Sequence, residues 1–132
     1  MSQEEGQEKC KTEGGKLSGL ETMQEAKFVN ETATNLMMAS GSVGEHGWMI
    51  WLSGERKESC RRPPGQSDKW DVPDHCKGVN GFTFDDHTLI SYGGYDWHEG
   101  EPNDKDRKQP CIGMMIASKE GDKRHGKMDD LT

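Results

Sequence analysis

The sequence has few of the residues that normally build a protein core. Leu, Ile, Val and Phe together number 17 of 132 residues, below the roughly 20% that a self-sufficient core needs. By itself this shortage favours disorder. However, the chain contains four Trp, four Cys and eight Met, which disordered segments seldom collect. We therefore expect residues 1–132 to form one small, loop-rich domain that is stabilised by disulfides or a metal.

Two further absences limit the partners of the protein. No apolar run of about 18 residues is present to span a membrane, and the first ten residues, MSQEEGQEKC, lack the basic and apolar regions of a signal peptide. There is also no basic stripe, because 17 Lys and Arg stand against 24 Asp and Glu and give a net charge of −7. These features argue against nucleic acid and anionic membranes as partners, and they favour a cation.

The cysteines indicate disulfides rather than a metal site. Cys10, Cys60, Cys76 and Cys111 have none of the C-x-x-C spacings of zinc sites or redox motifs. Disulfides are typical of secreted or extracellular proteins, which is the location we expect, with any secretion signal already removed. The short glycosylation sequon that begins at Asn30 points the same way.

Two helices are predicted near the start of the chain. The segment QEEGQEKCKTEGG is typical of a short helix that ends at Gly14 and Gly15. Apolar residues then recur every three or four positions from Ser18 to Leu36. Within that segment, Thr22 and a glutamate three positions later form a capping box, which begins the second helix near residue 23.

Three apolar runs predict strands. WMIWL, residues 48–52, and CIGMMIA, residues 111–117, are typical of strands that are buried on both faces, and GKMDDL, residues 126–131, follows a turn. The intervening residues 53–100 are rich in Gly, Pro, Asp and Ser, and so long a segment in a small domain is usually functional. Two helices followed by strands and a long loop predict the α+β class.

Oxygen-bearing side chains are concentrated in the segment DWHEGEPND and in the last strand. Glu101, Asn103 and Asp104 lie close together, and Asp129 and Asp130 are adjacent. If the last two strands pair as a hairpin, the two groups converge at one end. Such a set of oxygen donors suits calcium, which takes six to eight oxygens, better than zinc. The alternative is an ordinary solvated turn.

Pro102 bears on the same cluster. A cis peptide bond before it would turn the Glu101 and Asn103 side chains to the same side.

The segment WHEGEPND…C followed by GKMDD resembles the C-type lectin-like domain, whose long loop carries W-x-x-G-E-P-N and whose next strand carries W-N-D. CKTEGGKLSGLETMQEAKFV and WMIWLSG resemble its helix-to-helix segment and its W-I-G-L strand. The similarity runs from about residue 3 to residue 132. It implies a C-type lectin-like fold, with two helices, small antiparallel sheets and a long calcium-binding loop.

The resemblance also implies a ligand set. Calcium would be held by Glu101, Asn103, Gln109, Asp129 and Asp130, and all of these except Asp130 would also contact a sugar. The EPN triplet implies mannose-type sugars, namely mannose, N-acetylglucosamine, glucose or fucose. Gln109 stands where the family has Glu, and Asp129 stands where it has Asn. These departures leave open a protein- or surface-binding module of the same fold that does not bind sugar.

Two readings concern the cysteines and the ends of the chain. Cys10 and Cys111 match family cysteines whose partners would lie beyond Thr132, which leaves Cys60 and Cys76 for a local disulfide. The alternative is two free thiols. The family's first and last strands have no counterpart in the sequence, so we expect an exposed sheet edge at which a homo-oligomer could form.

Catalysis is not expected. No Ser-His-Asp or Cys-His order, phosphate loop or dinucleotide fingerprint is present. A hydrolase that uses the loop acids remains a rival from another class.

Overall fold

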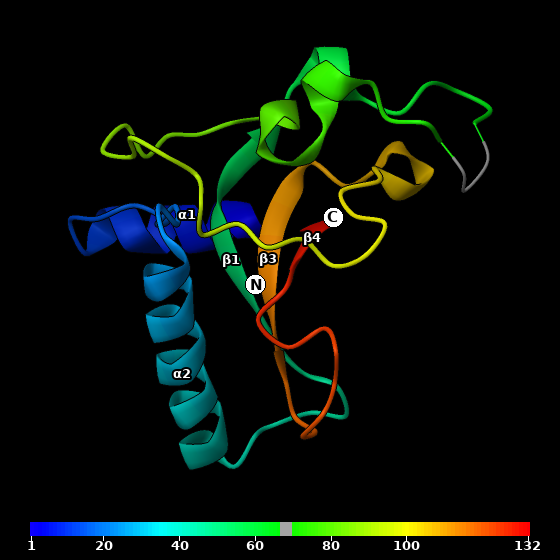
Figure 1. Cartoon of the computed structure of the whole chain (residues 1–132). Coiled ribbons are helices and arrows are strands. Elements are labelled where there is room, and N and C mark those ends of the chain that lie inside the picture. Colours follow the sequence, from blue (N-terminus) through cyan, green and yellow to red (C-terminus); the bar gives the residue numbers. More distant parts are fainter. Residues whose placement is uncertain (67–69) are drawn as a thin grey trace.

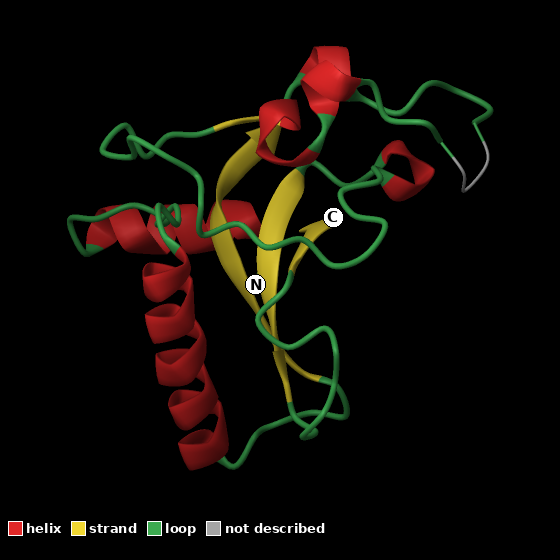
Figure 2. Cartoon of the chain, viewed as in Figure 1, coloured by secondary structure: helices red, strands yellow, loops and turns green. Residues whose placement is uncertain are grey.

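The computed structural model describes residues 1–66 and 70–132. The domain is α+β, as the sequence predicts, with two helices beside a small twisted sheet (Figure 1). Connecting segments and short 3-10 helices gather at one end of the sheet, at the top and right of the view in Figure 2. The candidate site lies among these segments.

The two helices occupy the predicted places. α1 spans Gln3–Thr12 and α2 spans Met23–Ser40. At the start of α2 the Thr22 side chain accepts a hydrogen bond from the Glu25 N–H, which satisfies a backbone donor that the first turn leaves free. Gly41 ends α2 in the left-handed conformation, at a φ of 68°. Neither described helix is both long and apolar enough to cross a membrane.

Four strands form one antiparallel sheet in the order β2-β1-β3-β4. Their bounds are Gly47–Arg56 for β1, Phe82–Thr83 for β2, Cys111–Ala117 for β3 and Met128–Leu131 for β4. The bounds of β3 are those predicted, and β4 begins two residues later than predicted. The predicted pairing of the last two strands as a hairpin is confirmed.

The prediction that residues 48–52 are buried on both faces is wrong. Only Leu52 in this run is buried, and Met49 is 36% exposed. Trp48 and Ile50 pack against the core, as alternate residues of a strand with one covered face do. In contrast, β3 is buried along all but its first residue. A continuous apolar run can therefore mark either kind of strand.

A bulge in β1 lies just before Arg56, a residue of the candidate site. The register with β3 shifts just before Glu55, and Gly54 has a φ of 135°. A Cβ at Gly54 would lie 2.5 Å from Cδ1 of Ile112, so only glycine fits there. Beyond the bulge, Arg56 donates its N–H to the Pro110 carbonyl at 2.8 Å. Its side chain is completely buried. The end of β1 thus places the Arg56 guanidinium in the interior, beside the long loop.

A disulfide holds the first part of the long connection between β1 and β3. Cys60 and Cys76 are bonded, with their Cα atoms 5.4 Å apart, and both are buried. The predicted pairing is therefore confirmed, and the alternative of two free thiols is wrong. The described part of this connection contains four 3-10 helices, η1 to η4, with the bounds Glu58–Cys60, Asp74–Cys76, Gly78–Gly81 and Lys105–Arg107.

The core lies between α2 and the sheet, and residues of the long connection complete it. Tyr95 donates its hydroxyl to the Ser53 carbonyl at 3.2 Å. Trp97 stacks on Phe82 with ring centroids 5.7 Å apart, so it packs under the loop. The buried apolar cluster comprises Leu20, Ala26, Ala33, Met37, Leu52, Phe82, Tyr95, Ile112, Met114, Ile116 and Met128.

Candidate metal and ligand site

The long loop is fastened to β4, which brings its acidic tip to the last strand. Met128 donates its N–H to the Asp96 carbonyl at 2.8 Å, and His98 donates to the Met128 carbonyl at 2.9 Å. In the hairpin, Asp130 lies opposite Ile112 at the end of β3 to which the loop connects. The loop and β4 therefore meet where the sequence predicts that the two acidic groups converge.

Four of the five predicted calcium ligands come together. One carboxylate oxygen from each of Glu101, Asp129 and Asp130 lies within 4.8 Å of the other two. Asn103 joins them, because its Nδ2 donates to Oε1 of Glu101 at 2.8 Å. The peptide bond between Glu101 and Pro102 is cis. The convergence of two distant segments, on which the calcium hypothesis depends, is thus present.

Two oxygens in this cluster lack a hydrogen-bond donor. Oε2 of Glu101 and Oδ1 of Asn103 are both buried, and no described residue donates to either. A buried acceptor without a donor costs about 1–3 kcal/mol, so such atoms are rare unless something else satisfies them. Both are oxygen atoms of the kind that hard cations bind. The chemistry of the donor set therefore fits calcium.

The electrostatics of the cluster favour an added positive charge. Burial is the main reason that the pKa of Glu101 is raised to about 8, and the neighbouring carboxylates of Asp130 and Asp129 add to it. The pKa of Asp129 is also raised, first by burial and then by Asp130. A proton or a cation would relieve this repulsion. We call Glu101, Asn103 and Asp129 the outer acceptor group.

Asp130 is in a different situation, because each of its oxygens has a partner. Its side chain is 0% exposed. Oδ1 accepts the Asn103 N–H at 3.0 Å, and Oδ2 accepts the Asp104 N–H at 2.6 Å together with a hydrogen bond from Nη2 of Arg56. Only the remaining lone pair of Oδ1 is available to a ligand.

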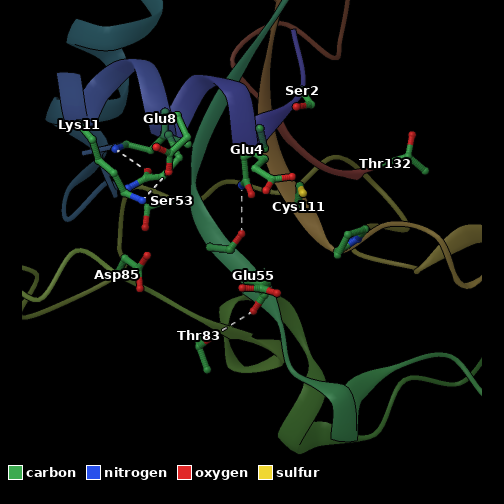
Figure 3. A pocket seen from close by; sticks show the side chains of 15 residues that line it. Ser2, Glu4, Glu8, Lys11, Ser53, Glu55, Thr83, Asp85, Cys111 and Thr132 are labelled. Carbon is green, nitrogen blue, oxygen red and sulfur yellow. Dashed lines mark hydrogen bonds and ion pairs between the residues drawn. The ribbon is translucent and has the colours of Figure 1, made fainter. Parts of the chain in front are cut away.

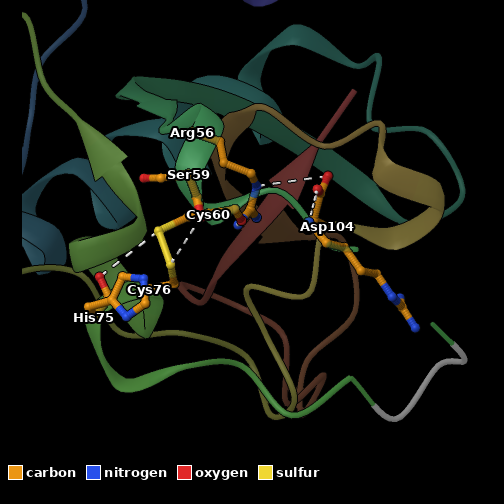
Figure 4. Close-up of a disulfide and its surroundings, with 7 residues drawn as sticks. Arg56, Ser59, Cys60, His75, Cys76 and Asp104 are labelled. Carbon is orange, nitrogen blue, oxygen red and sulfur yellow. Dashed lines mark hydrogen bonds and ion pairs between the residues drawn. A yellow bond between two sulfur atoms is a disulfide. The ribbon is translucent and has the colours of Figure 1, made fainter. Parts of the chain in front are cut away.

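Asp104, which lies in the loop, is the second buried carboxylate of the site (Figure 4). Oδ2 accepts the Arg62 N–H at 2.8 Å, and Oδ1 accepts the Gln109 N–H at 3.0 Å. Nη1 of Arg61 lies 3.4 Å from Oδ1, and Nε of Arg56 lies 3.8 Å from it. Arg56 therefore lies between two carboxylates, and we call Arg56, Asp104 and Asp130 the inner ion cluster.

The remaining donors of Arg56 are also used. Nε donates to the Gln109 carbonyl at 3.0 Å, and Nη1 donates to the Cys60 carbonyl at 3.3 Å. The guanidinium carbon lies 4.7 Å from the centroid of the Phe82 ring, at the distance of a cation–π contact. The guanidinium is thus surrounded by partners from β4, the long loop and the disulfide segment.

Gln109, the fifth predicted ligand, has its side chain engaged elsewhere. Its Oε1 accepts the Lys105 N–H at 2.6 Å. This bond closes the turn of η4, in which Asp104, Asp106 and Arg107 have positive φ. Ligation of a metal by Gln109 would require the bond to Lys105 to break.

The sequence analysis missed the inner ion cluster. The sequence places Asp104 among the oxygen donors of the loop tip, and it predicts no role for Arg56. A signal was present, because Arg56 comes shortly after the apolar run WMIWL, residues 48–52. Charged residues in such a place are usually paired.

A cavity lies beside α1, and no residue of the outer acceptor group lines it (Figure 3). It has a volume of about 590 Å³ and lies between α1, the end of β1 and Thr132. Cys111, one of two free cysteines, lies at its edge. Burial and the nearby Glu55 raise the pKa of the Cys111 thiol, so it stays protonated at neutral pH and is a poor nucleophile.

Comparisons with known proteins identify the family and the fold. A family model described as C-type lectin domain-containing protein 141/158 matches residues 1–132. The chain belongs to this family. The crystal structure of a calcium-independent type II antifreeze protein is similar, with a TM-score of 0.57 and 18% sequence identity over 99% of this chain and 69% of that chain. At this identity the likeness shows the C-type lectin-like fold alone. No curated protein sequence matches.

Membership of the C-type lectin domain family confirms the resemblance found in the sequence. Domains of this kind are generally non-enzymatic, are typically extracellular and often bind calcium, with glycans or proteins as their partners.

Proposed function

We propose that this C-type lectin domain binds glycans in a calcium-dependent manner through the tip of its long loop. The observation that supports this best is the pair of buried oxygens without donors, Oε2 of Glu101 and Oδ1 of Asn103. They lie in a cluster that also contains the half-buried carboxylate of Asp129. A divalent cation would satisfy both oxygens and offset the repulsion among the acids.

Glu101, Asn103 and Asp129 would hold the ion, and Asp130 would contribute through Oδ1 alone. When bound, the ion supplies positive charge and open coordination positions that two adjacent sugar hydroxyls can take. The carboxylates of Glu101 and Asp129 would accept hydrogen bonds from those hydroxyls. Gln109 is retained as a predicted ligand that would first have to leave its bond to Lys105.

The proposed sugars are of the mannose type: mannose, N-acetylglucosamine, glucose and fucose. The support for this class is the EPN triplet, in which the Asn103 amide and the Glu101 carboxylate lie in hydrogen-bond contact and present adjacent donor and acceptor groups. A single contact to a sugar diol is weak, so useful avidity would require several copies of the domain on one extracellular assembly.

Calorimetric titration with calcium, followed by methyl mannoside, tests the proposal. We expect calcium to bind at one site and the sugar to bind only after calcium. The Glu101→Gln variant should lose both heats, while the control Glu31→Gln, which alters an exposed acid on α2, should keep both. Calcium binding that is equal in wild type and Glu101→Gln would contradict the proposed site.

A second function, recognition of a protein or another surface without sugar, is favoured by one observation. Arg56 already neutralises Asp130, so part of the ligand set is satisfied without a metal. Retention on mannose-agarose separates the two functions. Release by a chelator supports the lectin, whereas absence of retention together with calcium binding supports the second function.

A further inference from the structure

Arg56 occupies an unusual position for an arginine. Its side chain is 0% exposed, and it ends the bulged strand β1 directly beneath the long loop. An isolated buried charge is energetically costly, so buried charges in proteins are usually surrounded by partners. Here the partners are carboxylates and carbonyls from three separate segments, including Asp130 of β4 and the Gln109 carbonyl of the loop.

The two carboxylates beside Arg56 determine the path of the loop. Asp130 accepts the N–H groups of Asn103 and Asp104, and these two residues directly follow the cis peptide. The Asp104 carboxylate in turn accepts the N–H groups of Arg62 and Gln109, which lie on either side of the loop tip. Four backbone donors thus converge on two anions, and each N–H…carboxylate bond is charge-assisted.

These bonds depend on the carboxylates being ionised. Asp104 and Asp130 are both fully buried, so their charges must be offset locally. Arg56 contacts both, whereas Arg61 contacts only Asp104 and is partly exposed. Arg56 is therefore the described cation that contacts both Asp130 of β4 and Asp104 of the loop.

We propose that the Arg56 guanidinium acts as an internal cation that holds the long loop in its binding conformation without any metal ion. Arg56 is a positioning residue in this proposal, because it faces the inner ion cluster and acts on the outer acceptor group through Asp130 and Asn103. The proposal goes beyond the glycan-binding function, since it describes the loop whether or not calcium or a sugar binds.

Amide hydrogen exchange of the wild-type protein in chelator provides the first test. We expect the N–H groups of Asn103, Asp104 and Gln109 to exchange about as slowly as those of β3, because their partners are buried and ionised. Fast exchange in chelator that becomes slow only after calcium is added would overturn the proposal. This measurement needs no variant, so it stands even where a substitution prevents folding.

Trypsin cleavage of Arg56 variants provides the second test. Lys105, Arg107 and Lys108 are exposed residues of the loop that trypsin can cut once the loop opens. In chelator, we expect Arg56→Met to raise the cleavage rate at these positions by at least about tenfold relative to wild type. Arg61→Met is the matched control and should change the rate less, because Arg61 does not contact Asp130.

The Arg56→Lys variant separates the charge from the packing. Met matches the arginine stem in length and apolar character, so a packing role predicts that Met protects the loop at least as well as Lys. An internal cation predicts the reverse order, with Lys intermediate between wild type and Met because one ammonium cannot reach every partner of a guanidinium. Equal resistance of Arg56→Met and wild type in chelator would overturn the proposal. Calcium calorimetry on wild type reports on the glycan-binding function separately.

Discussion

The inner ion cluster and the outer acceptor group include adjacent residues of the loop and of β4, but they differ in burial and in how their polar groups are satisfied. Arg56, Asp104 and Asp130 have fully buried side chains, and hydrogen bonds or ion pairs satisfy their charges. Glu101 and Asn103 are half-buried, and each retains one oxygen without a donor. Oxygens without donors, beside a cluster whose charges are all paired, are expected where a ligand binds rather than where a loop only has to fold.

Adjacent residues divide between the two groups. Along β4, Asp129 is half-buried and Asp130 is buried, because successive side chains of a strand face opposite sides. In the loop, Asn103 faces Glu101 through its side chain, while Asp104 faces the disulfide segment. In each pair, one residue organises the loop, and its neighbour remains available to a ligand.

Replacing Asp130 should have the largest effect on stability. We expect Asp130→Asn to lower the free energy of unfolding by about 3–5 kcal/mol, because the buried guanidinium of Arg56 loses its ionised partner. Urea denaturation in chelator measures this change. The matched variant Asp129→Asn should leave stability almost unchanged, because Asp129 offsets no buried cation. Equal losses in the two variants would erase the proposed division between inner and outer groups.

Removing the disulfide should have the next largest effect. Cys60 and Cys76 are separated by 16 positions, and such a crosslink contributes about 2–4 kcal/mol in the chain-entropy model. We expect the double variant Cys60→Ala and Cys76→Ala to lose that amount in urea denaturation. It should also loosen the inner cluster, since the Cys60 carbonyl accepts a hydrogen bond from Arg56. If the amide hydrogen exchange rates of the loop do not change in this variant, the disulfide stabilises the whole fold and not the inner ion cluster in particular.

Much of the fold could be predicted because local rules determine it. The capping residue Thr22 and the period of the apolar positions place α2, and the apolar run of β3 gives its bounds without error. The EPN triplet and the Asp pair located the acidic cluster, because the predicted hairpin brings them together. Each of these features depends on a few neighbouring residues.

The inner ion cluster could not be predicted in the same way. Arg56 is 74 positions from Asp130, and nothing near either residue indicates that they meet. Their contact depends on the bulge at Gly54 and on the order of the strands in the sheet, which are properties of the whole fold. The same reason explains Gln109, whose bond to Lys105 depends on the turn of η4 rather than on the family pattern.

Replacing Glu101 should change ligand binding more than folding. We expect Glu101→Gln to weaken calcium binding by at least about tenfold, or about 1.4 kcal/mol, because one ionised oxygen donor is lost. In chelator near pH 7 the same variant should be about as stable as wild type, since the raised pKa already leaves Glu101 largely protonated and uncharged there. Calorimetry and urea denaturation measure the two effects. A large loss of stability would place Glu101 in the inner cluster.

The smallest expected effect is a dependence of stability on pH in the metal-free protein. Burial, with the neighbouring carboxylates of Asp130 and Asp129, raises the pKa of Glu101 from its usual 4.5 to about 8 in the folded state. Between these values the folded protein therefore binds more protons than the unfolded chain, so stability falls as the pH rises through this window. We expect a change of about 1 kcal/mol or less, because partial exposure screens the charges. Thermal denaturation in chelator measures it, and Glu101→Gln should show a flatter profile because an amide does not titrate. An identical slope in that variant would assign the pH dependence to groups outside the outer acceptor group.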